Sequence, residues 1–244
     1  MYRIGIDIGS TFTKYCIRDE AAGKLELYAE ETPVRQREYF EDKLSQLKAE
    51  YPDCSVVTCG YGRKNIGYDR TVSELTALAA GAACLCPETS VVLDIGGQDT
   101  KIIRHEDGRL KAFFLNEKCA AGCGLFLGNV LRMLRTDFAA IDLREAAERE
   151  LRLSSVCAVF AQSEIVELLA NGAEGGDIVR AVLRQIFTQA RALLRKVDCS
   201  SLVLSGGLTK IPGVGDFAEQ ILEKQVAVPR NGAYLSAVGC AVYK

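Results

Sequence analysis

The feature that most constrains the fold is a pattern that occurs twice along the chain. IGIDIGSTFTKYCI begins at Ile4, and VVLDIGGQDTKIIR begins at Val91. When Asp7 is aligned with Asp94, both segments read Asp-Ile-Gly, three variable residues and then Thr-Lys. The spacing between the copies exceeds the roughly 20 to 50 residues of a solenoid repeat. The pattern therefore predicts two lobes, each of which opens with a similar hairpin.

Each copy has the composition of a strand, a glycine turn and a second strand. An apolar β-branched run enters the turn, Asp-Ile-Gly ends that run, and KYCI or KIIR leaves the turn. Glycines there let backbone N–H groups approach a phosphate, and an aspartate at a strand end can hold Mg²⁺. The chain contains no GxxxxGK[ST] motif, so it is not a P-loop protein. One such turn is equally a tight β-turn, but two matching turns that could face each other across a cleft favour phosphate binding.

The remaining segments predict an α/β protein in which strands and helices alternate. Further strands are expected at 25–32, 55–62, 201–206 and 226–229, and helices at 37–51, 72–86, 122–134, 143–151, 157–171, 176–197 and 231–244. The charged segment 144–152 is most simply the solvated face of its helix. The first lobe is expected to span 1–88, with 234–244 packing back on it, and the second lobe 89–233.

Composition and charge exclude several classes of function. The net charge of −2 provides no basic field for nucleic acid or for an anionic membrane. The longest apolar stretch, 75–86, is too short to span a bilayer. The N-terminal MYRIGIDIGS begins like a strand and lacks the layout of a signal peptide. We therefore expect a cytoplasmic protein without a nucleic-acid or membrane partner.

The chain has ten cysteines and one histidine, but no CxxC motif. Without a secretory signal, this pattern indicates reduced thiols, and the single histidine excludes a Cys₂His₂ zinc site. Free cysteine is among the most frequently buried residue types. The four cysteines at 16, 59, 84 and 240 lie in apolar runs and are expected in the core.

Three glycine motifs resemble those of a known superfamily. GIDIGSTFTK, LDIGGQDTK and LSGGLTK resemble the first phosphate, second phosphate and adenosine motifs of the acetate/sugar kinase–Hsc70–actin superfamily. NEKCAAGCG and SSVCAVFAQSE narrow this resemblance to the BadF/BadG/BcrA/BcrD ATPase family, particularly to activators of 2-hydroxyacyl-CoA dehydratases. The resemblance covers nearly the whole chain. It implies a two-lobed actin-like ATPase fold with duplicated lobes around a nucleotide cleft.

The resemblance also assigns residues to an ATP or ADP site with Mg²⁺. The residues expected to contact the nucleotide are Gly9, Ser10, Thr11, Lys14, Gly96, Gly97, Gln98, Gly206 and Gly207. Asp7 and Asp94 are placed to bind Mg²⁺ or its waters. Gln98 and Asp99 are the candidate catalytic residues that orient the attacking water, and the sequence leaves open which of them does so. Gly60 and Gly62 are expected to form a further turn at the edge of the cleft.

Two cysteines are predicted at or near the start of a helix. Cys119 precedes a segment with an apolar stripe, and Cys157 follows Ser154-Ser155, which are good N-cap residues. The helix dipole favours negative charge at such positions, and a thiolate-ligated iron–sulfur cluster is anionic. The resemblance assigns both cysteines as cluster ligands. The competing interpretation is a buried or redox-active thiol pair.

A [4Fe–4S] cluster usually needs four thiolates, and two per chain are not enough. A second copy must supply the other two, which predicts one cluster on the two-fold axis of a homodimer. Cys123 departs from the family pattern, in which Thr or Ser is usual at this position. We expect it to have no ligand role.

The resemblance implies an ATP-hydrolysing electron-transfer protein. Opening or closing of the nucleotide cleft would move the helices that begin near Cys119 and Cys157, and the electron would pass to a 2-hydroxyacyl-CoA dehydratase. A benzoyl-CoA-type reductase and a double-cubane cluster protein are alternative recipients. Reduced ferredoxin or flavodoxin would reload the activator. A small-molecule kinase of the same superfamily and a non-enzymatic regulatory module that uses ATP only as a ligand remain alternatives.

Overall fold

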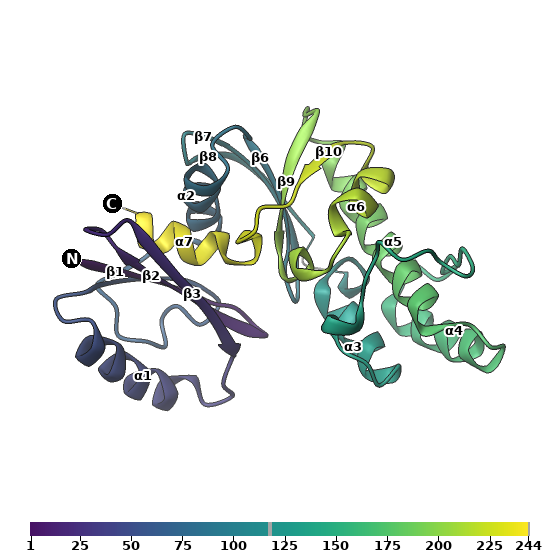
Figure 1. Ribbon diagram of the computed structural model, residues 1–244, viewed down its shortest axis with the longest axis horizontal. Helices are drawn as coiled ribbons and strands as arrows, with labels where there is room; N and C mark the ends of the chain where they lie inside the picture. The colour runs from purple at the N-terminus through teal and green to yellow at the C-terminus, as the bar shows by residue number, and fades with distance from the viewer. Residues whose placement is uncertain (117–118, 244) are drawn as a thin grey trace. The chain divides into compact units, whose positions relative to one another are not determined.

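The computed structural model describes residues 1–116 and 119–243 of the chain. They form two compact units (Figure 1). The first comprises Met1–Ser90, Ile103–Ala112 and Tyr234–Lys244, and the second comprises Val91–Ile102 and Phe113–Ala233. Each unit is described separately below. In the part of the chain that the structure describes, no helix is long and apolar enough to cross a membrane.

The first sheet has five strands in the order β3-β2-β1-β4-β5. The strands are β1 (Tyr2–Ile8), β2 (Phe12–Asp19), β3 (Lys24–Glu31), β4 (Ser55–Gly60) and β5 (Arg70–Thr71). β1, β2 and β3 form an antiparallel meander, whereas β4 lies parallel to β1 and β5 parallel to β4. The predicted strand–glycine turn–strand hairpin is therefore confirmed for the first copy of the repeat.

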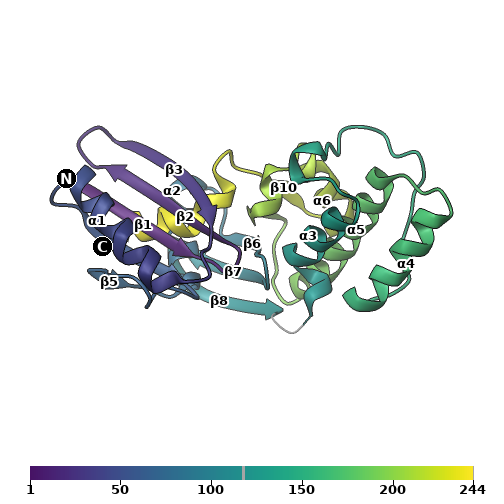
Figure 2. The same cartoon turned by 90° about the horizontal axis from the view of Figure 1, so that it is seen from below.

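Different helices cover the two faces of this sheet because its central strand alternates isoleucine with smaller or polar residues. Ile4 and Ile6 pack against Phe40 of α1 (Gln36–Glu50), which lies along the sheet in Figure 2. The opposite face carries Gly5 and receives α7 (Leu235–Val242). A Cβ on Gly5 would lie 2.0 Å from the Ala237 carbonyl oxygen, so only glycine allows this approach.

The remaining long helix of the first unit, α2 (Glu74–Leu85), crosses α7 at small residues. A Cβ on Gly239 would lie 1.7 Å from the backbone oxygen of Ala77. Ala77 and Leu78 in the first half of α2 are buried, whereas Cys84 in its last turn is exposed. The expected core position is therefore wrong for Cys84. It is confirmed for the cysteines at 16, 59 and 240, which have no exposed surface.

The second sheet has the order β10-β9-β6-β7-β8. Its strands are β6 (Val91–Ile95), β7 (Thr100–Glu106), β8 (Arg109–Asn116), β9 (Ser201–Gly206) and β10 (Gln225–Ala227). β9 lies parallel to both β6 and β10. The predicted strands did not include β5 or β8. In β8 exposed and half-buried residues alternate, which is the signal that would have identified this strand.

Among its described residues, the second unit contains four longer helices and several 3₁₀ turns. The helices are α3 (Gly124–Met133), α4 (Ala158–Ala170), α5 (Gly175–Leu194) and α6 (Val214–Leu222). The 3₁₀ turns include η1 (Ala120–Gly122), η2 (Phe138–Ala140) and η3 (Gly207–Lys210), and η4 (Gly232–Tyr234) precedes α7. One buried cluster joins β6 and β9 to these helices, with Phe126, Ile165 and Phe187 among its members. Two mixed five-stranded sheets with helices confirm the predicted α/β class.

The helix predicted at 143–151 is wrong, because this segment has no regular structure. Side chains of α5 bind its backbone groups instead. The N–H groups of Glu148 and Arg149 donate to the two carboxylate oxygens of Asp177, over 3.1 and 2.8 Å. The guanidinium of Arg180 donates to backbone carbonyls of the same segment. These tertiary hydrogen bonds replace the ones that a helix would make within itself.

Candidate functional site

The first glycine turn joins β1 to β2, and Asp7 is buried at the end of β1. Lys14 Nζ lies 3.9 Å from Asp7 Oδ2, and Cys59 Sγ donates to Asp7 Oδ1 over 3.6 Å. Thr32 directly follows β3, and its Oγ1 donates to the carbonyl of Gly9, which stabilises the turn. Ser10 is exposed, as is Thr11 beside it. The turn therefore presents exposed polar groups above a buried carboxylate.

The second glycine turn joins β6 to β7 and contains a more tightly held cation. Lys101 Nζ lies 3.3 Å from Asp94 Oδ2 and 2.7 Å from Asp99 Oδ1. All three side chains are buried. A Cβ on Gly96 would lie 2.7 Å from Asp99 Oδ1, so the turn closes tightly around this ion pair. Lys101 was not among the predicted site residues, although its alignment with Lys14 in the repeat was the signal that identifies it.

The two candidate catalytic residues of the second turn have different surroundings. Asp99 is buried and bound to Lys101, whereas Gln98 is exposed. A side chain that orients a water molecule must reach that water, and a carboxylate that neutralises a buried ammonium is held in place. The geometry therefore favours Gln98 for contact with a ligand and Asp99 for support of the turn.

The strands β4 and β9 end alike, beside the two aspartates. Cys59 pairs with Asp7 in the first sheet, and Ser205 pairs with Asp94 in the second. The next residue in each strand is a glycine in the left-handed region, Gly60 with φ 86° and Gly206 with φ 97°. A Cβ at either glycine would lie within 2.4 Å of a backbone oxygen of the neighbouring strand. The repeat thus includes SVVTCG and SLVLSG, a correspondence that the sequence analysis missed.

The second turn is hydrogen-bonded to the segment that carries Cys119. The N–H groups of Gly124 and Leu125, at the start of α3, donate to the carbonyls of Gly96 and Gly97, each over 2.8 Å. Thr100 Oγ1 donates to the carbonyl of Gly122 in η1. The first N–H groups of a helix have no partner within the helix, and here the glycine turn supplies one. Cys119 immediately precedes η1 and is therefore linked to the turn through a short run of hydrogen bonds.

Cys123 has a different environment from Cys119. It is the N-cap residue of α3, which begins two residues later than predicted. Its Sγ is buried and donates to the Ala120 carbonyl over 2.9 Å. Burial raises the pKa of the Cys123 thiol, and the nearby Asp99 carboxylate adds to this effect. The thiol is thus held in its protonated form inside the turn.

Cys157 is exposed and is the N-cap residue of α4, at the expected helix end. The preceding serines do not cap this helix. Instead, the N–H groups of Ser154 and Ser155 donate to the carboxylate of Glu164, over 2.7 and 3.0 Å. Val159 and Phe160, in the first turn of α4, are each 69% exposed. An exposed thiol therefore lies beside exposed apolar side chains.

Within residues 1–116 and 119–243, the structure contains no group of three or more His, Cys, Asp or Glu side chains arranged to hold a metal ion. One chain therefore does not bring together a complete set of cluster ligands among these residues. Cys119 and Cys157 belong to the same unit.

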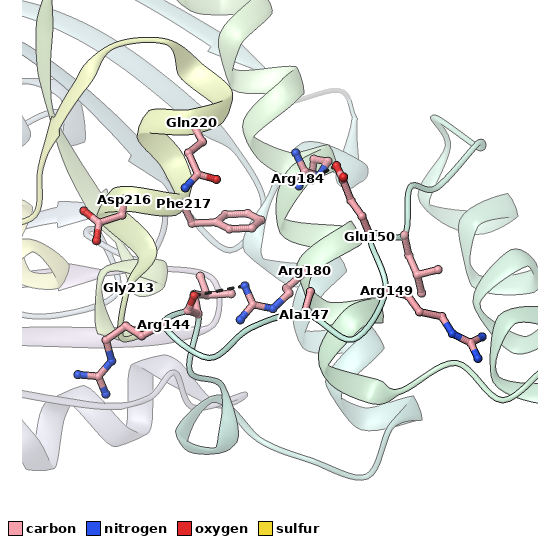
Figure 3. A pocket seen from close by; sticks show the side chains of 12 residues that line it. Arg144, Ala147, Arg149, Glu150, Arg180, Arg184, Gly213, Asp216, Phe217 and Gln220 are labelled. Carbon is pink, nitrogen blue, oxygen red and sulfur yellow. Dashed lines mark hydrogen bonds and ion pairs between the residues drawn. The ribbon is translucent and has the colours of Figure 1, made fainter.

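The second unit also contains a polar pocket of about 310 Å³ that no predicted site residue lines. Figure 3 shows Arg180 and Arg184 from α5 and Phe217 from α6 at this pocket, together with the irregular segment that contains Glu150. Arg184 pairs with Glu150 over 3.4 Å, and its guanidinium lies 5.7 Å from the centre of the Phe217 ring. The charged side chains that line the pocket are thus partly neutralised by contacts within the chain.

The duplicated sheets and glycine turns define an actin-like ATPase fold, as predicted. The model of the BadF/BadG/BcrA/BcrD ATPase family matches residues 4–243, and the chain belongs to this family. It is 36% identical to the activator of lactoyl-CoA dehydratase from Anaerotignum propionicum, over 100% of this chain and 97% of that protein. It is 33% identical to the (R)-2-hydroxyglutaryl-CoA dehydratase activating ATPase from Acidaminococcus fermentans, over 100% and 96% of the two chains.

A solved structure has the same fold over the whole length. It is the activator of the 2-hydroxyisocaproyl-CoA dehydratase from Clostridium difficile with bound ADPNP. The TM-score is 0.88 at 30% identity, and the match covers 100% of this chain and 94% of that one. That relative binds a nucleotide analogue, and the family assignment makes this chain an ATPase-family protein.

Proposed function

We propose that the protein is an ATP-hydrolysing iron–sulfur activator that transfers electrons to a partner enzyme such as a 2-hydroxyacyl-CoA dehydratase. The observation that carries the proposal is the hydrogen bonding between the second glycine turn and the start of α3. This contact joins a candidate phosphate-binding turn to the segment that contains Cys119. The names of the relatives, two of which are dehydratase activators and one an activating ATPase, support the same activity.

The proposed nucleotide site uses both glycine turns. Gly9, Ser10 and Thr11 bind phosphate oxygens from the first turn, with Lys14 as a nearby cation. Gly96, Gly97 and Gln98 do so from the second turn, and Gly206 and Gly207 accommodate the adenosine. Ser10, Thr11 and Gln98 present exposed polar side chains, and Gly206 has the positive φ of a glycine turn, as such a role requires.

The carboxylates of Asp7 and Asp94 fit Mg²⁺, which prefers oxygen ligands and usually retains several waters. Both are buried at strand ends, and each has a lysine ammonium within 4 Å of one carboxylate oxygen. The bound ion would neutralise phosphate charge during hydrolysis. Gln98 orients the attacking water, and Asp99 acts as a positioning residue by holding Lys101.

Cys119 and Cys157 are the proposed ligands of one [4Fe–4S] cluster per homodimer. Their thiolates fit such a cluster, whereas the buried Cys123 thiol donates a hydrogen bond to a backbone carbonyl. A cluster held by two chains would supply one-electron transfer at low potential. The exposed apolar side chains beside Cys157 support its burial against a second copy, since exposed apolar patches mark interaction sites.

Coupling between ATP and electron transfer would follow from contacts within the second unit. Loss of the terminal phosphate changes the partners of the second turn, whose carbonyls also hold the first N–H groups of α3. Movement of that helix start would alter the surroundings of Cys119 and so the reduction potential of a cluster bound there. Reduced ferredoxin or flavodoxin is the proposed donor. A benzoyl-CoA-type reductase or a double-cubane cluster protein is the alternative recipient, and a small-molecule kinase is the alternative function.

Anaerobic purification followed by iron, sulfide and mass analysis tests the proposal. We expect about four irons per dimer, as one [4Fe–4S] cluster requires. Replacement of Cys119 or Cys157 by Ser removes the iron, whereas Cys123→Ser is the matched control and keeps it. Four irons per monomer, or a monomer that retains its cluster, would contradict the dimeric site. A colourless, iron-free protein that phosphorylates a sugar would favour the kinase.

A further inference from the structure

A buried thiol contacts the aspartate of the first turn, and the proposed nucleotide site does not account for it. Cys59 pairs with Asp7 in parallel register between β4 and β1. Parallel partners direct their side chains to the same face of a sheet. The Cys59 Sγ donates to Asp7 Oδ1 over 3.6 Å, a normal length for a hydrogen bond from sulfur, and Cys59 has no exposed surface.

The C-terminal helix α7 packs on the same face of the sheet, next to this contact. Gly5 lies on the same face as Asp7, and a Cβ at this glycine would be 2.9 Å from the Cβ of Cys240 in α7. Cys240 and Cys59 belong to one buried cluster, and neither has exposed surface. Cys59 is thus enclosed between Cys240 and the Asp7 carboxylate.

In the second turn the corresponding residue donates to a different group, although the strands have the same register. Ser205 stands beside Asp94 as Cys59 stands beside Asp7, but its Oγ donates to the Gly232 carbonyl over 3.1 Å. Asp94 is instead within 3.3 Å of the buried Lys101. The cation beside Asp7 is farther away, at 3.9 Å, and is partly exposed. The contacts of the first carboxylate thus include a neutral thiol donor and a more distant, partly exposed lysine.

We propose that Cys59 is a positioning residue that holds Asp7 Oδ1 so that the carboxylate is oriented for a divalent cation. The inference rests on the proposed function, because it requires Asp7 to bind Mg²⁺ with the nucleotide. A thiol is a weak donor, so it restrains the carboxylate while leaving most of the negative charge available to the ion. A hydroxyl can make the same bond, and a methyl group cannot.

The free Mg²⁺ concentration that gives half-maximal ATP hydrolysis tests this role at saturating ATP. Cys59→Ala is expected to raise that concentration about tenfold, the effect of one hydrogen bond to a charged group. Cys59→Ser restores it to within about threefold of wild type, because the hydroxyl still donates. Cys16→Ala is the matched control, since Cys16 is equally buried in the same sheet and pairs with Gly5 rather than with Asp7. This control keeps the wild-type Mg²⁺ dependence.

A second readout uses the metal-free protein. The infrared difference spectrum between wild type and Cys59→Ala isolates the S–H stretch of Cys59. Asp7→Asn is expected to shift this band to higher frequency, because a neutral oxygen is the weaker acceptor. The corresponding band of Cys16 is expected not to move. Melting curves of all variants verify that they fold.

The outcomes separate the two proposals. If wild type hydrolyses ATP but Cys59→Ala and Cys16→Ala show the same Mg²⁺ dependence, the positioning role is wrong and the proposed function stands. A Cys59 band that does not respond to Asp7→Asn also overturns the positioning role. If wild type hydrolyses no ATP under any condition with its partner, the proposed function fails and this inference fails with it.

Discussion

The two glycine turns share a sequence pattern and differ in how each holds its aspartate. In the second turn Lys101 is almost completely buried, with its side chain 3% exposed, and binds both Asp94 and Asp99. In the first turn Lys14 is 22% exposed, and Phe12 occupies the position that corresponds to Asp99. The two copies thus share their strand register and the glycine at the end of the neighbouring strand, whereas the charged groups around the aspartate differ.

The largest expected difference between the turns concerns stability. Lys101→Met leaves two buried carboxylates without their ammonium, and the free energy of unfolding is expected to fall by about 3 to 5 kcal/mol. Lys14→Met removes a longer, partly exposed pair and is expected to cost less than about 1 kcal/mol. Urea denaturation followed by circular dichroism measures both. Addition of Asp99→Asn to Lys101→Met should recover part of the loss, and equal effects of the two lysines would refute the contrast.

The next prediction concerns hydrolysis. Gln98→Ala is expected to lower kcat about 100-fold, because a preorganised donor near the reacting water is lost. Thr11→Ala changes the aligned position of the first turn and is expected to lower kcat less than threefold. Steady-state kinetics, with ATP affinity measured separately by calorimetry, distinguish catalysis from binding. A kcat for Gln98→Ala close to that of wild type would indicate that Asp99, not Gln98, orients the water.

A third prediction concerns the glycine with positive φ that ends β4 in one unit and β9 in the other. Gly206→Ala is expected to lower the free energy of unfolding by about 2 kcal/mol, because alanine is strained at positive φ and its Cβ would meet Ile95. Gly60→Ala is expected to have a similar effect beside Ile8. Gly128→Ala in α3 is the control, since nothing lies near its Cβ position, and it should be neutral or stabilising. Thermal melting compares the three variants.

The smallest expected effect concerns the helix start at Cys157, which has no counterpart in the first unit. Burial would raise the pKa of Glu164, but the N–H groups of Ser154 and Ser155 hold this pKa below its usual value. The ionised form is thus favoured in the folded state, so its stabilisation is present above the unfolded pKa and is lost as the pH falls through the folded pKa. Glu164 thus contributes to the fall in the free energy of unfolding between pH 6 and pH 3, by less than about 1 kcal/mol. Glu164→Gln should remove this contribution, as measured by denaturation at several pH values. An unchanged slope would show that these hydrogen bonds are made equally well by the neutral side chain.

The repeat predicted correctly the features that depend on neighbours in the sequence. Apolar β-branched runs ending at Asp-Ile-Gly became β1 and β6, and the helix starts near Cys119 and Cys157 lie within two residues of their predicted positions. The roles assigned to the nucleotide and cluster residues stay predictions until the variants are measured. Local pattern is informative here because hydrogen bonds along a strand or helix involve nearby residues.

The errors arose where distant side chains changed the local preference. The helix predicted at 143–151 gave way because Asp177 and Arg180, from α5, bind its backbone groups. Cys84 lies in an apolar run but in the last turn of α2, where its side chain is exposed. Neither outcome could be read from composition, since both depend on which elements pack together.

The sequence by itself determined the α/β class, the duplication and the two strand-end aspartates, because these follow from periodicity and from the backbone freedom of glycine. Only the tertiary structure decided that Lys101 neutralises Asp99, that Cys123 is turned inward and that Cys59 donates to Asp7. The reason is physical. Strand pairing brings Cys59 to Asp7 from 52 residues away along the chain, where no local pattern records the contact. The partners of Lys101 and Cys123 are near in sequence, but their burial depends on the elements that pack around the turn.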